Sequence, residues 1–324
     1  LIKASNIREF ILFRALAHFM NDQSFITQVH DGFNINQPDF LLPQSEFIEI
    51  QLEHNEHSDY RQIAIELFQR ALKMSEGDKA LNVVIDLKRL QYAYNQLQGS
   101  EKDSLYLNAL DKLIEDNKDE PNSLYAYMKL IEYHQAYSEM YNNRFEEKYA
   151  HHTSEAYRAI QSAKKQFPDE KLINQIESQK SRLNKKYLSC EMEEVVPPNQ
   201  EFLCFINYRN IQKIHFKLLR LEENDFDKFN KIKTKPERLN FLQSRALQKK
   251  WSHDLPGSKD FNYHGIEFPI EGLEFGQYVL LSSPNNSFKL SDQNPVGINF
   301  FTVSAMNYLH SVGDTKTDII VTDR

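Results

Sequence analysis

The sequence is poor in glycine and in cysteine, and it lacks any long apolar run. Only 9 of its 324 residues are glycine, whereas 22 are phenylalanine and 16 are tyrosine. Many aromatic residues and few glycines favour packed helices over an architecture rich in loops. Because no apolar stretch approaches the roughly 20 residues that cross a bilayer, we expect no membrane span in this chain.

Concentrated positive charge is also missing. The net charge is −7, and acidic and basic residues are interleaved along the chain. Binding to phosphate backbones needs a cationic face, so nucleic acid is not an expected partner. The length suits two domains better than one. The sequence begins with Leu1, and we expect a processed or excised part of a longer polypeptide, with any targeting signal outside this sequence.

Residues 1–186 have the periodicity of helices. Apolar residues recur at helical spacing from Ile7 to Ala17. An irregular segment, interrupted by Pro38 and Pro43, follows. Further helices are predicted near residues 59–74, 79–97, 100–116, 123–142, 154–166 and 169–186. Their expected N-caps include Ser100, Ser123 and Ser154.

Two of these helices share a pattern of small residues. The matching triplets are Ala64, Phe68, Ala71 and Ala156, Ile160, Ala163. This pattern is typical of the second helix of a tetratricopeptide repeat, although the period of about 34 residues is not sustained. A degenerate tetratricopeptide-like stack and a generic helical bundle are both open interpretations.

Near Tyr187 the apolar period changes from helical to two residues, which is typical of strands. Strands are predicted at residues 188–192, 202–208, 211–221, 247–253, 264–270, 277–283 and 298–309, with a short helical interruption at 225–242. Leu203 and Phe205 are also apolar, so we expect the second strand to be buried on both faces. The predicted fold class is α+β: an all-α stack (1–186), then an all-β macroglobulin-like, immunoglobulin-type sandwich (187–310). A strand at 317–322 predicts that residues 311–324 begin a further domain.

The two cysteines lie on either side of a proline turn. Cys190 and Cys204 are equidistant from Pro197-Pro198, so a hairpin centred there would make them face each other. Two interpretations are open: a pair of buried thiols that pack as small apolar groups, or a cross-strand disulfide.

Several tyrosines are candidates for contact. Tyr133, Tyr137 and Tyr141 recur at intervals of four on one predicted helix. This face either lines a groove for a partner protein or packs against a neighbouring helix. Tyr278, at the start of a late strand, either hydrogen-bonds back across a sandwich corner or is a simple strand residue.

Sequence signatures of catalysis are lacking. We find no nucleophile elbow, phosphate-binding loop, dinucleotide fingerprint or zinc-protease helix. His54 and His57 have a metal-like spacing, but further ligands would be needed and a solvated loop is favoured. We therefore nominate no catalytic, cofactor-binding or metal-binding residue, and we expect a protein that is not an enzyme.

Five segments resemble the N-terminal region of bacterial alpha-2-macroglobulin-like proteins. They are IREFILFRALAHFMND, AIQSAKKQFPDEKLINQIES, LSCEMEEVVPPNQEFLCFINYRNIQKIHFKLLRL, FGQYVLLSS and INFFTVSAMNYL. The resemblance implies an envelope-associated, periplasmic protein, often lipid-anchored, whose full length traps proteases. In many members a thioester arises from Cys-x-Glu-Gln, and neither Cys190 nor Cys204 stands in such a motif.

The resemblance therefore implies a non-catalytic scaffold that contacts proteins, namely downstream domains of its own polypeptide, proteases or envelope proteins. Two alternatives remain. The chain is a free-standing helical-repeat adaptor that binds peptides or an envelope assembly, or it is a glycan-active enzyme with an unrecognised site.

Overall fold

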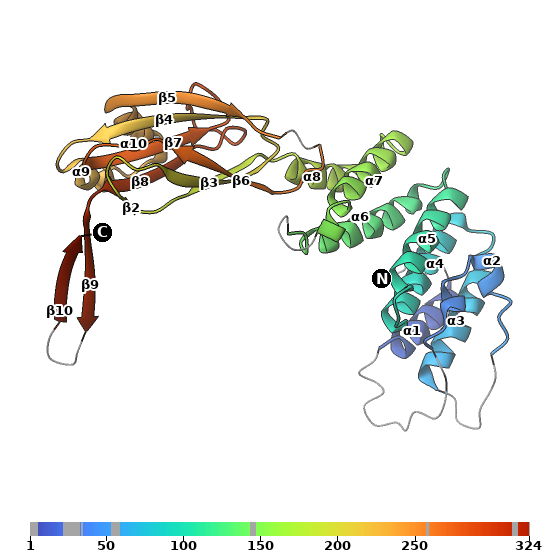
Figure 1. Ribbon diagram of the computed structural model, residues 1–324. Helices are drawn as coiled ribbons and strands as arrows, with labels where there is room; N and C mark the ends of the chain where they lie inside the picture. Colours follow the sequence, from blue (N-terminus) through green and yellow to red (C-terminus); the bar gives the residue numbers. More distant parts are fainter. Residues whose placement is uncertain are drawn as a thin grey trace. The chain divides into compact units, whose positions relative to one another are not determined.

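The computed structural model describes residues 6–21, 33, 35–52, 59–142, 147–256, 259–312 and 317–323. As the sequence predicts at the coarse level, the chain is an α+β protein, with helices in its first part and sheets in its second (Figure 1). It divides into two compact units. The helical unit comprises Leu1–Tyr137 and Glu155–Lys180, and the sheet unit comprises Ser138–Ser154 and Ser181–Arg324.

Among the described residues, the helices of the first part are α1 (Ile7–Phe19), η2 (Pro38–Leu41), α2 (Gln44–Phe47), α3 (Tyr60–Met74), α4 (Lys79–Gln96), α5 (Lys102–Asp116), η3 (Pro121–Ser123), α6 (Leu124–Ser138), η4 (Glu147–Tyr149), α7 (His152–Gln166) and α8 (Ile173–Leu183). Seven of them, α1 and α3 to α8, correspond to predicted helices, whereas η2 and α2 lie in the segment predicted to be irregular and η3 and η4 were not predicted. The small-residue triplets of α3 and α7 are fully buried, so they form the packing faces of these helices. Whether the stack is tetratricopeptide-like stays a prediction.

The expected serine caps are wrong, and the structure instead shows aspartate caps on two other helices. Asp59 and Asp78 precede α3 and α4, and their Oδ1 atoms accept backbone N–H groups two and three residues further on, at 2.8 and 3.0 Å. A carboxylate satisfies these free N–H groups and also interacts favourably with the positive end of the helix. Ser123 instead ends η3, Ser154 lies inside α7, and α5 begins two residues after Ser100.

The sheet unit contains two packed sheets and a pair of short helices. Its elements are β1 (Tyr187–Glu191), β2 (Val195–Val196), β3 (Phe202–Arg209), β4 (Lys213–Leu221), α9 (Asp225–Lys231), α10 (Lys235–Gln243), β5 (Ala246–Asp254), β6 (His264–Ile270), β7 (Gly276–Ser283) and β8 (Gly297–Val303). One sheet has three strands, in the order β1-β3-β6. The other has five, in the order β2-β8-β7-β4-β5, with β2 parallel to β8. The chain between β1 and β2 therefore crosses from one sheet to the other.

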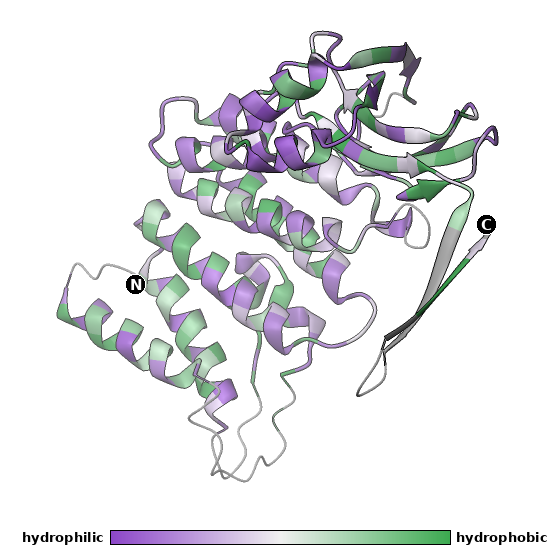
Figure 2. Cartoon of the chain, turned by 90° about the vertical axis from the view of Figure 1, so that its left-hand side faces the viewer, coloured by the Kyte–Doolittle hydropathy of each residue, from purple (hydrophilic) through white to green (hydrophobic). Residues whose placement is uncertain are grey.

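The five-stranded sheet is covered on both faces. Towards the three-stranded sheet it contributes Ile214, Phe216, Leu218, Tyr278, Leu280, Phe301 and Val303. Towards α9 and α10 it contributes Leu219, Leu221, Val279 and Leu281, which pack with Phe229, Leu239 and Leu242. Strands covered on both faces have apolar residues at successive positions, which explains the runs in β4 and β7. In Figure 2, hydrophobic residues are green, and green segments are visible on the strands of the sheets.

Two expectations for the strands are corrected. Leu203 on β3 is 55% exposed, because the three-stranded sheet has only one face on the core. The single strand predicted at 298–309 is two strands, β8 and β9 (Met306–Val312). The strand predicted at 317–322 is β10 (Thr317–Asp323), which among the described strands pairs with β9 alone, in a separate two-stranded sheet. The predicted boundary after residue 310 therefore falls inside β9.

Candidate functional site

The described part of the chain contains no cluster of His, Cys, Asp or Glu side chains arranged to hold a metal ion. His54 and His57 lie outside the described residues. In the same described part, every helix is too short or too polar to cross a bilayer. The candidate surfaces include a tyrosine cluster, a groove in the helical unit and a cavity in the sheet unit.

Tyr133 and Tyr137 lie in a cluster with tyrosines of neighbouring helices. The ring of Tyr133 is 6.5 Å from that of Tyr94 on α4 and 6.4 Å from that of Tyr106 on α5, and the latter two rings stack at 4.2 Å. Asp103 joins the cluster, because its carboxylate accepts the hydroxyl groups of Tyr94 and Tyr137 at 2.7 and 2.6 Å. These rings therefore pack between helices, which is the second of the two interpretations given above.

The surroundings of this cluster hold its hydroxyl groups in the neutral form. Burial, with the charge of Glu132, raises the pKa of Tyr106 to about 12. Burial and the adjacent Asp103 carboxylate raise the pKa of Tyr94 and of Tyr133 well above the usual range. A tyrosine that keeps its proton is a hydrogen-bond donor, and its role here is structural.

Tyr141 does not share that helix face. The helix predicted to run to residue 142 ends at Ser138, so Tyr141 follows α6 and belongs to the sheet unit. Its pKa is raised by burial and by the charges of Asp260 and Glu147. The predicted three-tyrosine contact face is therefore split, because the helical period alone did not reveal where α6 ends.

The cysteines are free thiols, and both are buried. β1 and β3 pair antiparallel across the proline segment, but their register pairs Cys190 with Ile206 rather than with Cys204, and the chain that connects them crosses to the other sheet as β2. Cys204 is thus the diagonal neighbour of Cys190, in the same core. A hydrogen bond between the two thiols, together with burial, raises the pKa of Cys190. Disulfide formation stays a prediction.

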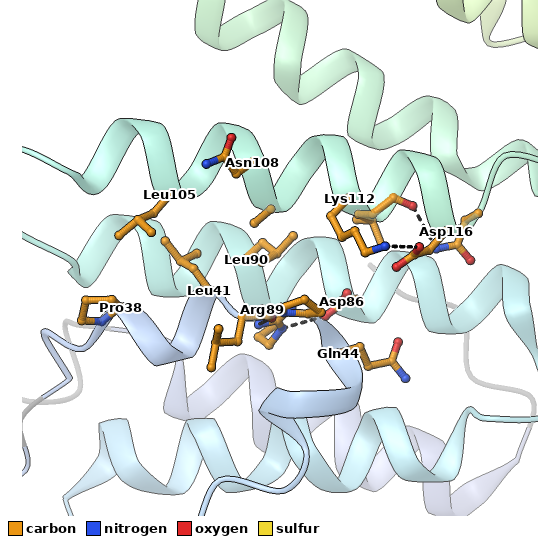
Figure 3. Close-up of a pocket in the computed structure, with 15 residues that line it drawn as sticks. Pro38, Leu41, Gln44, Asp86, Arg89, Leu90, Leu105, Asn108, Lys112 and Asp116 are labelled. Atoms are coloured by element: carbon orange, nitrogen blue, oxygen red, sulfur yellow. Dashed lines mark hydrogen bonds and ion pairs between the residues drawn. The ribbon is translucent and has the colours of Figure 1, made fainter.

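A groove of about 450 Å³ opens between α4, α5 and the segment from Pro38 to Gln44. Figure 3 shows Leu41, Leu90 and Leu105 along its apolar part. At the other end, Lys112 and Asp116 of α5 form an ion pair at 2.8 Å. The groove thus has apolar walls and a polar end.

The floor of the groove contains a buried arginine. Arg89 is 1% exposed, and its Nε donates to Asp86 Oδ1 at 2.6 Å. Its Nη1 donates to the carbonyls of Phe40 and Leu42 at 2.8 and 2.9 Å, and the guanidinium lies 4.5 Å from the ring centre of Phe47. The guanidinium therefore makes three hydrogen bonds to internal partners and holds the segment from Pro38 to Phe47 against α4.

Sequence reasoning did not identify this pair. Its signal is a charged residue at i and at i+3 within the apolar run VVIDLKRL. In that setting both side chains lie on one side of a helix that is apolar on most of its surface, and a buried ion pair follows.

In the sheet unit, Tyr278 forms a tyrosine corner. Its hydroxyl donates to the carbonyl of Glu274 at 3.0 Å, and its ring is buried against Phe301. Gly276, which lies between Glu274 and Tyr278 in the sequence, has a φ of 156°, in the region that favours glycine. Of the two interpretations of Tyr278, the hydrogen bond across the corner is confirmed.

Comparisons with known proteins give weak similarities. No family model and no curated protein matches the chain. Among solved structures, the CARDB domain of a Pyrococcus furiosus protein, solved in complex with di-metal ions, is 12% identical over 37% of this chain and 87% of its own, with a TM-score of 0.23.

Native alpha-2-macroglobulin from Escherichia coli is also similar in structure. The fragment spanning domains MG0-NIE-MG1 is 15% identical, with a TM-score of 0.32, over 43% of this chain and 45% of its own. The fragment spanning NIE-MG1 is 12% identical, with a TM-score of 0.29, over 43% of this chain and 70% of its own. The chain thus matches less than half of the longer fragment, and similarity at this level assigns it to no family.

Proposed function

We propose that this chain is a non-catalytic protein-interaction scaffold, and that the helical groove receives an apolar helical segment of a partner protein. The proposal is supported mainly by the internal ion pairing of the charged side chains around the groove. Arg89 and Asp86 bind each other, and so do Lys112 and Asp116. With these charges paired internally, the apolar walls are the main recognition surface.

The resemblance in sequence supports a wider context for this scaffold. In that context the chain is the N-terminal part of a large bacterial alpha-2-macroglobulin-like envelope protein, located in the periplasm, whose full length traps proteases. Reading the gene beyond Arg324 tests this context. Further sandwich domains support it, whereas a stop codon favours a free-standing adaptor.

Binding to the groove is tested with a labelled amphipathic peptide that carries leucines at i, i+3, i+4 and i+7. Leu105→Glu places a charge in the apolar wall, and we expect it to abolish the change in fluorescence polarisation. Leu107→Glu is the matched control, since Leu107 is on the same helix, is equally half-buried and does not line the groove. Equal affinity of the two variants, at equal thermal stability, would contradict the proposal.

The absence of catalysis is tested separately. Purified chain is incubated with chromogenic glycosides and peptides, and no turnover above the buffer blank is expected. Turnover that copurifies with the chain would replace the scaffold with the enzyme alternative.

A further inference from the structure

The outer edge of β8 is only partly paired. Thr302 N donates to Glu194 O at 2.8 Å, and Ser304 N donates to Val196 O at 3.0 Å, which is the short contact with β2. Along its other edge, β8 pairs with β7 from Gly297 to Val303. Among the described residues, β2 is the strand that pairs with the outer edge. The N–H groups of alternate residues point to the same edge of a strand, so those of Ile298 and Phe300 point to the open edge.

A cavity of about 720 Å³ lies along this edge. One wall is the segment that crosses between the sheets, with Met192 and Val195, and another is Phe226 of α9. The Phe226 ring is 47% exposed and contacts the Phe300 ring edge-on, at 5.2 Å between centroids. Apolar surface therefore borders an open run of backbone hydrogen-bonding groups.

The rim of this cavity is acidic. Glu191 and Glu194 line it, and an adjoining cavity is lined by Glu222, Glu223 and Asp227. The two cavities share Leu221, Phe226 and Gln277, and neither lining includes a lysine or an arginine.

The nearby basic residues have internal partners. On α9, Lys228 ion-pairs with the buried Asp225 at 3.4 Å. On β4, Arg220 donates to the carbonyl of Phe275 at 3.1 Å and approaches Glu274. The rim therefore presents a field of one sign to an approaching partner.

We propose that this edge binds an extended peptide segment of another protein, with apolar residues alternating with lysine or arginine, as a strand added beside β8. Main-chain hydrogen bonds to Ile298 and Phe300 supply affinity, and alternate side chains meet the apolar cavity and the acidic rim. The partner segment is basic because the rim is acidic. This site lies in the sheet unit and does not depend on the function proposed for the helical groove.

The opposite edge of the same sheet carries charge of the other sign. The strand at that edge, β5, carries Lys249 and Lys250 on a largely exposed surface. Lysines on an edge strand discourage pairing with further strands. The edge of β8 has carboxylates around it instead of cations on the strand, and it has a cavity beside it.

The test uses the full chain and a fluorescein-labelled peptide of alternating valine and lysine. We expect saturable binding that weakens as salt is added. A peptide with glutamate for lysine, and one with the amides of one edge N-methylated, are both expected to bind at least about tenfold more weakly. Equal binding of the N-methylated peptide would overturn strand addition.

Variants of the chain locate the binding. Ile298→Pro removes an N–H on the open edge, where proline is tolerated, and should abolish binding. Glu191→Lys with Glu194→Lys should weaken it about tenfold. The matched control is Glu201→Lys with Glu267→Lys, the same charge change on exposed residues outside both cavities, and should leave affinity unchanged.

Two outcomes would overturn the proposal even if Ile298→Pro does not fold. One is equal loss of affinity in the two charge-reversed pairs, which would indicate a non-specific charge effect. The other is reversible self-association of the unmodified chain in sedimentation that the valine–lysine peptide cannot displace and that the Glu191→Lys/Glu194→Lys pair abolishes. That outcome would make the edge an interface between copies.

Discussion

The helical unit and the sheet unit stabilise their cores in different ways. In the helical unit, polar side chains hold the segment from Pro38 to Ile50 in place: the buried Arg89 binds the carbonyls of Phe40 and Leu42, and the partly buried Gln69 binds those of Phe47 and Ile50. In the sheet unit, apolar residues cover both faces of one sheet, and a buried carboxylate, Asp225, lies at the helices on its outer side. Chain without regular structure needs side-chain partners for its carbonyls, whereas a strand ladder supplies its own.

The largest expected effect is on the buried charge of the helical unit. Arg89→Ala leaves the Asp86 carboxylate buried without its partner, and should cost about 3–5 kcal/mol of unfolding free energy. Denaturant unfolding followed by far-ultraviolet circular dichroism reports mainly on helices. The fluorescence of Trp251, the single tryptophan, reports on the sheet unit. We expect the denaturant midpoint of the circular dichroism transition to fall and that of the Trp251 fluorescence transition to stay unchanged.

Two further variants sharpen this prediction. Arg158→Ala removes an exposed arginine that ion-pairs with Glu155, and should leave both transitions in place. The double variant Arg89→Met/Asp86→Leu replaces the ion pair with apolar groups, and should recover part of the loss. A shift of the Trp251 transition as large as that of the helices would show that the two units unfold together.

A slightly smaller effect is expected in the apolar core between the sheets. Leu280→Ala on β7 opens a cavity in a fully buried position, and should cost about 3 kcal/mol. Here the Trp251 transition should shift, and the helical transition should not. Leu247→Ala, at an exposed position on β5, is the control. A cost for Leu280→Ala no greater than that of the control would contradict the two-faced burial of this sheet.

A pH effect is expected in the helical unit. The pKa of Tyr106 is raised in the folded chain from 10.0 to about 12, so the folded state keeps a proton that the unfolded state releases. Stability from this group is complete below the unfolded pKa and is lost as pH rises towards the folded one. The free energy of unfolding of the helical unit, measured by circular dichroism in denaturant, should therefore fall as the pH rises from 10.0 to about 12.

The same cluster can be tested through Asp103. Asp103→Asn removes a negative charge beside Tyr94, so the pKa of Tyr94 should fall towards its usual value. Ultraviolet absorbance of tyrosinate during alkaline titration measures the change. Asp119→Asn, at an exposed position, provides the control. Identical titration curves for the two variants would contradict the role assigned to Asp103.

The smallest effect concerns the thiols of the sheet unit. Because the pKa of Cys190 is raised, little thiolate is present at mildly alkaline pH. Alkylation by iodoacetamide should be at least about tenfold slower in the folded chain than in denaturant. Mass spectrometry counts the adducts, and non-reducing digestion would detect a disulfide. Equal rates in the two states would contradict the burial of both thiols.

Local signals predicted the elements well and their ends less well. Alternation placed β6 at His264–Ile270, as the structure has it, because its spacing is visible within a few residues. The end of α6 at Ser138 was missed, since tyrosines continue at helical spacing past the last turn. The serine caps were wrong because α5 begins at Lys102 and α7 at His152, so Ser100 and Ser154 do not stand at the cap position, where a serine would be favourable.

Long-range pairing was harder to predict. The proline turn suggested a simple hairpin. β1 and β3 do pair antiparallel, but their register places the cysteines at diagonal positions. Val195 and Val196, in the connection between them, pair in parallel with β8, more than a hundred residues later. The buried Arg89 likewise depends on carbonyls more than forty residues earlier in the chain. A local pattern carries no information about which distant backbone groups will need a donor.

The ribbon formed by β9 and β10 has a practical consequence for the laboratory. Met306, Ile319, Ile320 and Val321 are each more than half exposed in the folded chain. Dyes whose fluorescence increases on binding to exposed apolar surface should therefore fluoresce in the presence of the folded protein. A bright dye signal at room temperature would not diagnose a molten or damaged sample, and melting curves should be recorded by an intrinsic probe instead.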